Sequence, residues 1–447
     1  MDHQKKTKRL IFLQLNELNF NLIEKYCKKY DLKNFSKLLL CKRARTTSEN
    51  TYEKLEPWIQ WTSVYTGLSA DEHKIFRLGD TKNTKNLEFI FEKVEKKNFK
   101  VGCISPFNVV NNLKNPSYFI SDPWTQTSSD GSFWSRLISN LAVQTINDNA
   151  KGKISIKHYF VIILLVMKFV RIKKISKLGY IIFQSFYKKW MKALVLDYLL
   201  NEIHLNLFYQ NKPNLSSLFL NAGAHTHHHY LFFSEFVDNG FKNKLGWYLN
   251  SKYDPIYDLL KVYDSILDDY INNNINLIIH TGLHQIPNDM IKYYYRLRDH
   301  EKFIKLFKFN FKKIIPRMSR DFLIEFDNEK DAFVAEKTLK EIVNISNNER
   351  IFNVVDNRGK SIFVTLTYPN KISNETKIKV GKKYINLISH VVFAAIKNGI
   401  HDEHGFVFLK GNIAKFSPKN DEHAKEIFYT ISNYFNINPS KLETENI

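Results

Sequence analysis

The sequence contains few cysteines, and they lie far apart. Only Cys27, Cys41 and Cys103 occur among the 447 residues, and no two of them form a CxxC pair. A disulfide framework and a zinc–thiolate site both require cysteines at closely patterned spacings. This scarcity argues against both and favours a reducing compartment, so we expect a cytoplasmic protein.

Long apolar runs are also missing. The longest candidate, residues 159–167, is bounded by His158 and Lys168 and falls well short of the ~20 apolar residues that a membrane-spanning helix needs. A run at residues 10–15 follows a basic amino terminus, but it is too short for a signal-peptide core and lacks a small-residue cleavage site. We interpret this run as a first strand and expect no segment that spans a membrane.

Acidic residues are outnumbered by basic ones. The chain has 45 Asp and Glu against 66 Lys and Arg, which gives a formal net charge of +21. Such a charge attracts anionic partners, for example phosphorylated substrates, acidic lipid or nucleic acid. A compositional bias toward Lys, Asn, Ile, Phe and Tyr explains the charge equally well. Because no recognisable RNA- or DNA-binding signature accompanies the lysines, we expect no specific nucleic-acid partner.

Strand-like and helix-like segments alternate along most of the chain. Apolar runs predict strands over residues 10–15, 100–105, 215–220 and 275–279. Between the first two runs, Pro57 suits the first turn of a helix that Gly67 can end. The alternation predicts an α/β fold with a mostly parallel central sheet flanked by helices.

The chain exceeds the length at which a single core usually stops growing, so we expect a large elaborated domain. A strand, a helix and a hairpin predicted between residues 322 and 368 indicate a small α+β accessory subdomain. The predicted parts are residues 1–135 (first part of the α/β core), 136–200 (a basic amphipathic helical insertion), 201–290 (second part of the core), 291–385 (the α+β accessory insertion) and 386–447 (last part of the core).

The segment from residue 151 to residue 192 is basic and apolar at once. It contains eleven Lys and Arg residues, no Asp or Glu, and many aliphatic and aromatic residues. A basic amphipathic stretch of this kind can lie on an anionic membrane surface. A pair of helices that packs on the core and exposes a solvated basic face is the alternative.

Polar side chains gather where the predicted strands end, which is the edge at which open parallel sheets bind ligands. These positions are Asn16 and Glu17, residues 221–229, His280 and His284, and residues 401–404. The segment AHTHHHY supplies His225, His227, His228 and His229 within five residues, and imidazole is a common ligand for transition metals. The pattern predicts a metal or substrate site; a hydrogen-bonded polar network is the alternative.

The order of these elements resembles the alkaline phosphatase superfamily, especially its type I phosphodiesterase and nucleotide pyrophosphatase branch. The segment TGLSADEHKI at Thr66 and His73 resembles the Thr-Gly and later His of that family. The segment from Asn221 to His225 resembles its Asp-x-x-Gly-His element, and Gly399 and His401 resemble its late Gly-x-His. The resemblance implies the superfamily's fold and metal-dependent chemistry on phosphate esters.

The strand-end positions and the resemblance together give a set of candidate metal ligands, and the chain departs from the family pattern in two respects. The candidate ligands are Asn16, Glu17, Asn221, His225, His228, His284, His401 and His404, with zinc or manganese as the expected divalent cation. Two family aspartates correspond to Asn16 and Asn221, whose amides bind a divalent cation more weakly than carboxylates do. Where the family places its nucleophile, this chain has Leu55, Glu56 and Pro57.

Candidate catalytic and substrate-binding residues surround that helix start. Glu56 could act as a general base, ligate a metal or cap its helix. Thr46 and Thr47 offer hydroxyl groups, although no adjacent base marks them as activated nucleophiles. Two arginines and a tryptophan are the candidate substrate contacts, through a bidentate phosphate clamp and ring stacking respectively; they are Arg43, Arg45 and Trp61.

The leading hypothesis is a cytoplasmic, or membrane-peripheral, metal-dependent hydrolase or transferase that acts on a phosphate ester or phosphodiester. Its substrate would be an anionic small molecule, or a lipid-linked or surface-glycan molecule if the basic insertion meets an anionic membrane. The second hypothesis is a catalytically altered superfamily member that serves as a binding or assembly protein in glycan biosynthesis.

Overall fold

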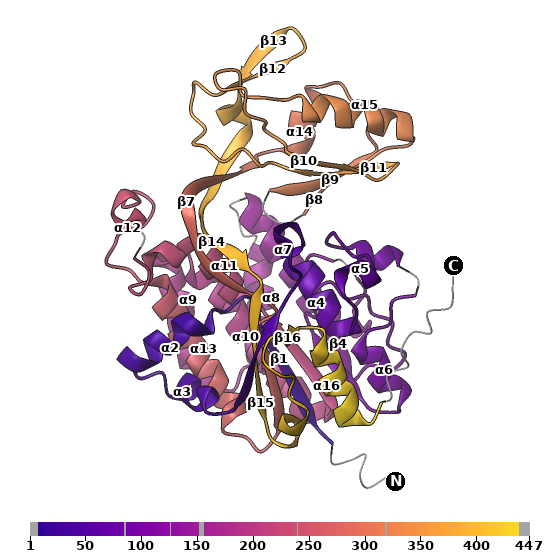
Figure 1. The fold of residues 1–447 in the computed structure, drawn as a ribbon, viewed down its shortest axis with the longest axis vertical. Coiled ribbons are helices and arrows are strands. Elements are labelled where there is room, and N and C mark those ends of the chain that lie inside the picture. The colour runs from indigo at the N-terminus through magenta and orange to yellow at the C-terminus, as the bar shows by residue number, and fades with distance from the viewer. Residues whose placement is uncertain are drawn as a thin grey trace. The chain divides into compact units, whose positions relative to one another are not determined.

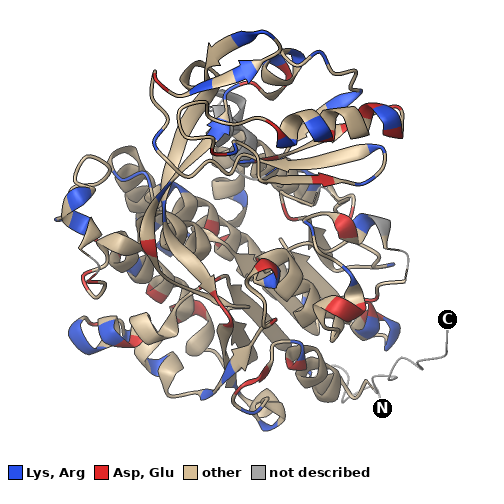
Figure 2. Ribbon diagram, turned by 45° about the horizontal axis from the view of Figure 1, so that its top comes forward, with Lys and Arg blue, Asp and Glu red and all other residues tan. Residues whose placement is uncertain are grey.

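The computed structural model describes residues 8–84, 86–125, 127–151, 156–238, 240–317 and 320–437. Lys153, one of the lysines of the basic segment, lies outside the described residues. The chain divides into two compact units. The first unit comprises Met1–Thr145, Ile154–Pro287 and Gly399–Ile447, and the second comprises Ile146–Lys153 and Asn288–Asn398. Figure 1 shows the fold, and Figure 2 shows lysine and arginine on the ribbons of both units.

An eight-stranded sheet in the order β16-β2-β15-β6-β1-β5-β3-β4 forms the centre of the first unit. Its strands are β1 (Leu10–Leu15), β2 (Lys42–Thr47), β3 (Val101–Ile104), β4 (Tyr118–Ile120), β5 (Leu215–Leu220), β6 (Asn276–His280), β15 (His404–Lys410) and β16 (Glu422–His423). The pairs around β1 and β3 are parallel, whereas β15 is antiparallel to both β2 and β6. The predicted α/β class with a mostly parallel sheet is confirmed.

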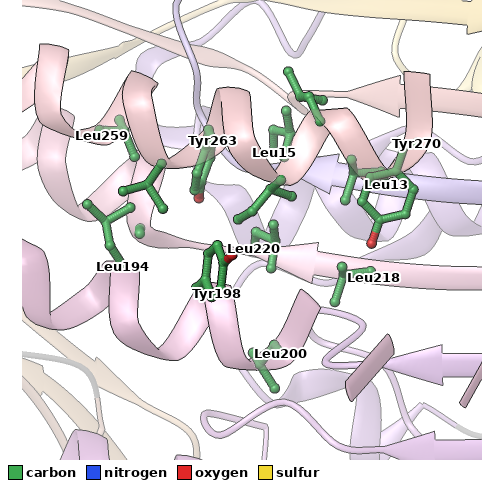
Figure 3. Close-up of a cluster of buried hydrophobic side chains, with 14 of the residues drawn as sticks. Leu13, Leu15, Leu194, Tyr198, Leu200, Leu218, Leu220, Leu259, Tyr263 and Tyr270 are labelled. Carbon is green, nitrogen blue, oxygen red and sulfur yellow. The ribbon is translucent and has the colours of Figure 1, made fainter. Parts of the chain in front are cut away.

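The central strands are buried on both faces because helices cover both faces. Every residue of β1 and β5 is buried, and the two strands pair in register from Leu10 with Leu215 to Leu15 with Leu220. Side chains alternate between the faces of a strand. Leu13 and Leu15 therefore pack with α10 and α13 in the core of Figure 3, while Phe12 packs against Trp61 of α4 on the other face.

The helices form two layers around this sheet (Figure 1). Those outside Asn288–Asn398 are α2 (Phe20–Lys29), α3 (Lys33–Leu39), α4 (Pro57–Thr66), α5 (Ala70–His73), α6 (Ile90–Lys96), α7 (Phe133–Lys151), α8 (Ile156–Phe169), α9 (Ile172–Tyr187), α10 (Met191–Asn211), α11 (Ala222–Tyr230), α12 (Phe241–Lys244), α13 (Pro255–Ile271) and α16 (Glu426–Phe435). Short 3-10 helices are η1 (Tyr52–Lys54), η2 (Asp80–Asn83), η3 (Leu231–Phe233), η4 (Leu387–His390) and η5 (Asn412–Phe416).

Local signals placed α4 where the sequence predicted it. Pro57 occupies the first turn, and Gly67 ends the helix with a left-handed φ of 73°. A Cβ atom on Gly67 would lie 2.7 Å from Cδ1 of Phe428, so glycine also lets α16 approach closely. This helix brings Glu56, its N-cap residue, to the edge of the sheet.

The second unit has its own antiparallel sheet, in the order β10-β11-β9-β8, and its own buried cluster that includes Phe322, Ile324 and Leu339. Its elements are α14 (His300–Lys305), β8 (Lys313–Pro316), β9 (Asp321–Glu325), α15 (Glu329–Lys340), β10 (Val354–Asn357), β11 (Ser361–Thr365), β12 (Lys377–Val380) and β13 (Lys383–Asn386). The predicted hairpin is β10 and β11. Two further strands, β7 (His284–Leu297) and β14 (Val391–Asp402), pair with each other, and the boundary between the units falls within both.

The basic segment folds into helices, as predicted. It contains all of α8 and α9, and both helices pack on α10. No helix among the described residues is both long enough and apolar enough to cross a membrane.

Candidate metal centre

The turn after β1 places Glu17 at the edge of the sheet. The backbone N–H of Asn16 donates to the carbonyl of Leu220, and the N–H of Glu17 donates to that of Thr281. Glu17 adopts a left-handed φ of 62°, which is costly for a residue with a side chain and is found at functional sites more often than elsewhere. In this turn the Glu17 carboxylate faces the rings of His228 and His401.

The histidine-rich helix α11 begins at the end of β5, and a buried carboxylate holds its first turn. Asp197 accepts hydrogen bonds from the N–H groups of Ala222 (2.7 Å) and Asn221 (3.3 Å) and from the Tyr263 hydroxyl (2.6 Å). Burial raises the pKa of Asp197 to about 6, although these hydrogen bonds oppose the shift. Gly223 has no space for a Cβ atom, which would lie 2.9 Å from the carbonyl oxygen of Asn16, so α11 lies directly against the turn after β1.

The third segment of the site comes from β14 and its connection to β15. Because β15 is antiparallel to its neighbours, its first residue, His404, pairs with Thr47 at the end of β2. The residues before β15 therefore reach the same edge as the residues that follow β1 and β5. A Cβ atom on Gly399 would lie 2.9 Å from the carbonyl oxygen of His227, so this glycine allows β14 to approach α11.

Three ligand atoms meet at this edge. Glu17 Oε2 lies 3.1 Å from His228 Nε2 and 3.2 Å from His401 Nε2, and the two ring nitrogens are 3.3 Å apart. A tetrahedral zinc ion with bonds of about 2.0–2.1 Å separates its ligand atoms by about 3.3–3.4 Å. Glu17, His228 and His401 therefore form one face of such a tetrahedron with little movement. We call these residues the three-ligand group.

Glu17 is held as an anion inside the protein. Burial alone would raise the pKa of its carboxyl, but the facing rings of His401 and His228 hold that pKa well below its usual range. Its side chain also accepts hydrogen bonds from Gln285 Nε2 and, at 3.1 Å, from Asn16 Nδ2. A buried carboxylate beside two imidazole nitrogens supplies ligand atoms of the kind that a divalent cation binds.

Glu56 lies on the far side of the His401 ring. Its Oε2 is 3.7 Å from His401 Nδ1, and its side chain makes no capping hydrogen bond to α4. A carboxylate facing one nitrogen of a histidine favours a proton there, which leaves the other nitrogen as a ligand. Glu56 is thus positioned to direct Nε2 of His401 toward Glu17.

Two buried polar atoms next to Glu17 have no hydrogen-bond partner among the described residues. They are Nε2 of His227 and Oε1 of Gln285. His227 Nδ1 lies 2.9 Å from the carbonyl of Gly223 and must donate to it, so Nε2 carries a lone pair. Burial lowers the pKa of His227 to about 4, which keeps this ring neutral near pH 7. Unsatisfied buried acceptors are rare and fit a site that takes up a ligand.

A second histidine pair lies at the first residues of β7 and β15. His284 Nδ1 donates to the carbonyl of His404 over 2.7 Å, and its Nε2 lies 3.7 Å from Asp402 Oδ1. The same carboxylate oxygen is 2.8 Å from His404 Nδ1. His284 is also paired with Glu17 through a backbone bridge, which puts this pair beside the three-ligand group.

The structure brings some predicted ligands together and gives others different roles. Glu17, His228 and His401 meet, whereas Asn16 uses its amide oxygen to accept from Trp61 Nε1 (2.7 Å) and its amide nitrogen to donate to Asn221 (2.8 Å). These two amides therefore brace the turn around Glu17. His225 stacks edge-on against His229, with ring centroids 4.7 Å apart, and desolvation lowers its pKa to about 4.

The residues predicted to bind substrate have partners of their own. Arg43 pairs with Glu24 (2.6 Å), and Arg45 forms a bidentate pair with Asp421 (2.6 and 2.9 Å). Trp61 is completely buried among aromatic rings, so its face is not open to a ligand.

The hydroxyl groups of the two candidate nucleophiles also have polar partners within the protein. The buried Thr46 hydroxyl lies 3.3 Å from Nε2 of His280, and Thr47 donates to the carbonyl of Asp421 over 3.4 Å.

Sequence reasoning missed two residues of the site. Gln285, which donates to Glu17, follows the predicted ligand His284 directly, and Asp402 directly follows His401. Adjacency to a candidate ligand was the available signal for both. Neither residue stood out, because Gln and Asp are common on surfaces and nothing in the sequence shows that Gln285 is buried or that Asp402 faces two histidine rings.

Taken together, the sheet, its helical layers and the three-ligand group define an α/β protein with a candidate divalent-cation site at one edge of its sheet. No protein-family model matches the chain, and no curated protein matches its sequence.

Solved structures that align with this chain include members of the superfamily that the sequence resembles. Phosphonoacetate hydrolase from Sinorhizobium meliloti 1021 has 10% identity, with 95% of each chain covered and a TM-score of 0.42. Human ectonucleotide pyrophosphatase/phosphodiesterase 5 has 11% identity, with 96% of this chain and 95% of that chain covered and a TM-score of 0.42. Alkaline phosphatase from the Antarctic bacterium TAB5 has 10% identity, with 96% and 99% covered and a TM-score of 0.36.

Proposed function

We propose that the protein is a divalent-metal-dependent enzyme that hydrolyses or transfers a phosphate ester or phosphodiester. The observation that carries the proposal is the three-ligand group, in which Glu17, His228 and His401 present three ligand atoms within 4.8 Å of one another. A cation held there would act as a Lewis acid toward a phosphoryl oxygen. Two imidazole nitrogens and one carboxylate suit zinc best, with manganese as the second choice.

The chain's own residues prepare this site in three ways. Gln285 and Asn16 hold the Glu17 carboxylate in place, and Glu56 faces the distal nitrogen of His401. His227 offers a neutral, buried acceptor beside them. The net charge of +21 favours an anionic substrate, either a small molecule or one linked to a lipid or glycan carrier in the cytoplasm.

The second candidate function is a binding or assembly protein that retains the cation site without turnover. It is favoured by Asn16 and Asn221, whose paired amides stand where the related family has carboxylates. It is also favoured by Glu56, which replaces the family's nucleophile. The two amides supply less negative charge for a second cation than carboxylates would. Glu56 leaves no hydroxyl group at the start of α4.

Metal analysis and a turnover assay on the full chain test both functions. We expect about one equivalent of zinc after reconstitution, and release of nitrophenolate from bis(p-nitrophenyl) phosphate or p-nitrophenyl phosphate. Glu17→Gln and His228→Asn should each weaken metal binding at least tenfold and reduce turnover to background. The matched control His390→Asn, in the second unit, should keep both.

The metal-binding and turnover results distinguish the two candidate functions. Tight metal binding without turnover on phosphomonoester, phosphodiester or phosphonate substrates would favour the binding protein. A chain that binds neither zinc nor manganese would contradict the proposal.

A further inference from the structure

The helices α8 and α9 expose an unusual density of large apolar side chains. Ten of the exposed large hydrophobic residues among those described lie between positions 160 and 187. On α8 they are Phe160, Ile163, Leu164 and Met167. On α9 they are Ile172, Ile175, Tyr180, Phe183, Phe186 and Tyr187. So many large apolar side chains exposed within one short stretch of the chain point to an interaction surface.

The spacing places each set on one side of its helix. The α8 residues recur at intervals of three and four, which is the period of one helical face. The opposite side of α8 is buried through Leu165 and Phe169, and that of α9 through Leu178 and Ile181. Each helix is therefore apolar on both sides, and only its inner side is covered by the core. We call the exposed side chains of the two helices the outer apolar face.

The outer apolar face is fixed in place. Arg171, in the two-residue turn between α8 and α9, forms bidentate pairs with the buried Glu202 (2.5 and 2.8 Å) and with Asp269 (2.8 Å for both contacts). Lys188 at the end of α9 donates to Asp258 over 2.8 Å. Ion pairs join both ends of α9 to buried or half-buried carboxylates. The outer apolar face is therefore a preformed platform, held in a fixed position on the core.

The charge at this platform has one sign. No Asp or Glu occurs between residues 151 and 192. The acidic partners of the turn belong to α10 and α13 and are already neutralised by Arg171 and Lys188. Lys168, Lys173 and Lys189 are exposed and make no ion pair within the described part of the chain. The platform therefore presents apolar side chains flanked by uncompensated positive charge.

We propose that the outer apolar face docks onto the surface of an anionic lipid bilayer. Met167, Ile172, Phe186 and Tyr187 are 76%, 87%, 72% and 75% exposed, and they would enter the region between headgroups and acyl chains. The flanking lysines would meet the lipid phosphates or carboxylates. A second copy of the chain fits less well, because two such faces would bring their lysines together without any acidic partner.

Vesicle co-sedimentation of the full chain tests this inference. We expect binding to vesicles with 30 mol% phosphatidylglycerol in phosphatidylcholine, and at least tenfold weaker binding to pure phosphatidylcholine. Phe183→Ser/Phe186→Ser should weaken binding to the anionic vesicles at least tenfold. Lys168→Glu/Lys173→Glu/Lys189→Glu should weaken it at least a hundredfold, since the loss of each positive charge near such a surface costs roughly a fivefold change and the new carboxylates add repulsion.

Matched controls distinguish binding through the outer apolar face from nonspecific binding of the protein to vesicles. Phe333→Ser and Lys337→Glu alter an exposed aromatic and a lysine on α15, and both should leave vesicle binding unchanged. Glu17→Gln should also bind vesicles normally, so the inference stands apart from the proposed enzymatic function.

Three results would overturn the inference: equal binding to neutral and anionic vesicles, no binding to either, or a stable dimer that Phe183→Ser/Phe186→Ser converts to a monomer.

Discussion

Glu56 occupies the start of α4, but its side chain faces a histidine ring and makes no capping hydrogen bond. Its Oε2 lies 3.7 Å from Nδ1 of His401, which is longer than a direct hydrogen bond and short enough for strong charge interaction. The sequence left three roles open for this residue: a base, a ligand and a cap. The geometry favours a positioning role, in which Glu56 stabilises the ring form of His401 that offers Nε2 as a ligand.

We expect Glu56→Gln to weaken metal binding by roughly tenfold to a hundredfold, as loss of an outer carboxylate partner typically does. Turnover should recover when metal is supplied at saturation, because the variant keeps the three ligand atoms. Competition with a chelator measures the affinity, and kcat is compared at saturating metal. Unchanged affinity with lost turnover would instead assign Glu56 as a base.

His204 illustrates how burial fixes the protonation of a side chain. The Tyr270 hydroxyl donates to Asn201 and therefore accepts from His204 Nδ1, so His204 Nε2 accepts from Ser216. Burial lowers the pKa of His204 to about 3, so the native state keeps this ring neutral. The unfolded chain takes up a proton near pH 6.5, and the stability that His204 contributes is lost as the pH falls from there toward 3.

We expect His204→Asn to be less stable than the wild type at pH 7.5, by about 1–3 kcal/mol, because its hydrogen bonds are broken. The difference in the free energy of unfolding between wild type and variant should decrease by about 2 kcal/mol at pH 5, since only the wild type has this histidine to protonate on unfolding. Urea denaturation at both pH values measures this difference. Tyr270→Phe is the control, because it removes a hydrogen bond but keeps the histidine; a difference that is equally pH-dependent in both variants would contradict the explanation.

At the scale of elements, the site depends on how closely α11, β14 and the turn after β1 approach one another. Gly223 and Gly399 allow that approach, since a Cβ atom on either would lie 2.9 Å from a backbone carbonyl oxygen. The antiparallel strand β15 supplies the third segment by bringing the residues before it to the edge where β1 and β5 end. The sequence indicated that His401 belonged to the site but not that the strand beside it ran in reverse.

We expect Gly399→Ala to lower stability by about 1–3 kcal/mol, as overpacking does. The new methyl group would also lie 2.1 Å from Oε1 of Gln285, so it should displace the donor that holds Glu17 and weaken metal binding. Thermal unfolding and metal affinity are the two measurements. Gly246→Ala is the matched control, because its Cβ atom has its nearest neighbour at 3.8 Å. Full metal affinity in Gly399→Ala would show that close packing is not required.

At the scale of the whole molecule, each unit has its own buried cluster. The first cluster joins β1, β5 and β6 to helices such as α10 and α13, and it includes Leu165 and Leu178 from the basic segment. The second joins β9 and β11 to α15. The inner sides of α8 and α9 thus belong to the same core that supports the three-ligand group, while their outer sides remain exposed.

The amino-acid sequence by itself determined the α/β class, the position of strands such as β1 and β5, and the helix that begins at Pro57. These features depend on local apolar runs and on backbone preferences within a few residues. The tertiary structure alone decided that Glu17, His228 and His401 meet while Asn16 and Asn221 brace the turn beside them. Distances of about 3 Å between residues hundreds of positions apart depend on strand order, strand direction and close packing at glycines, and none of these is encoded in any single segment.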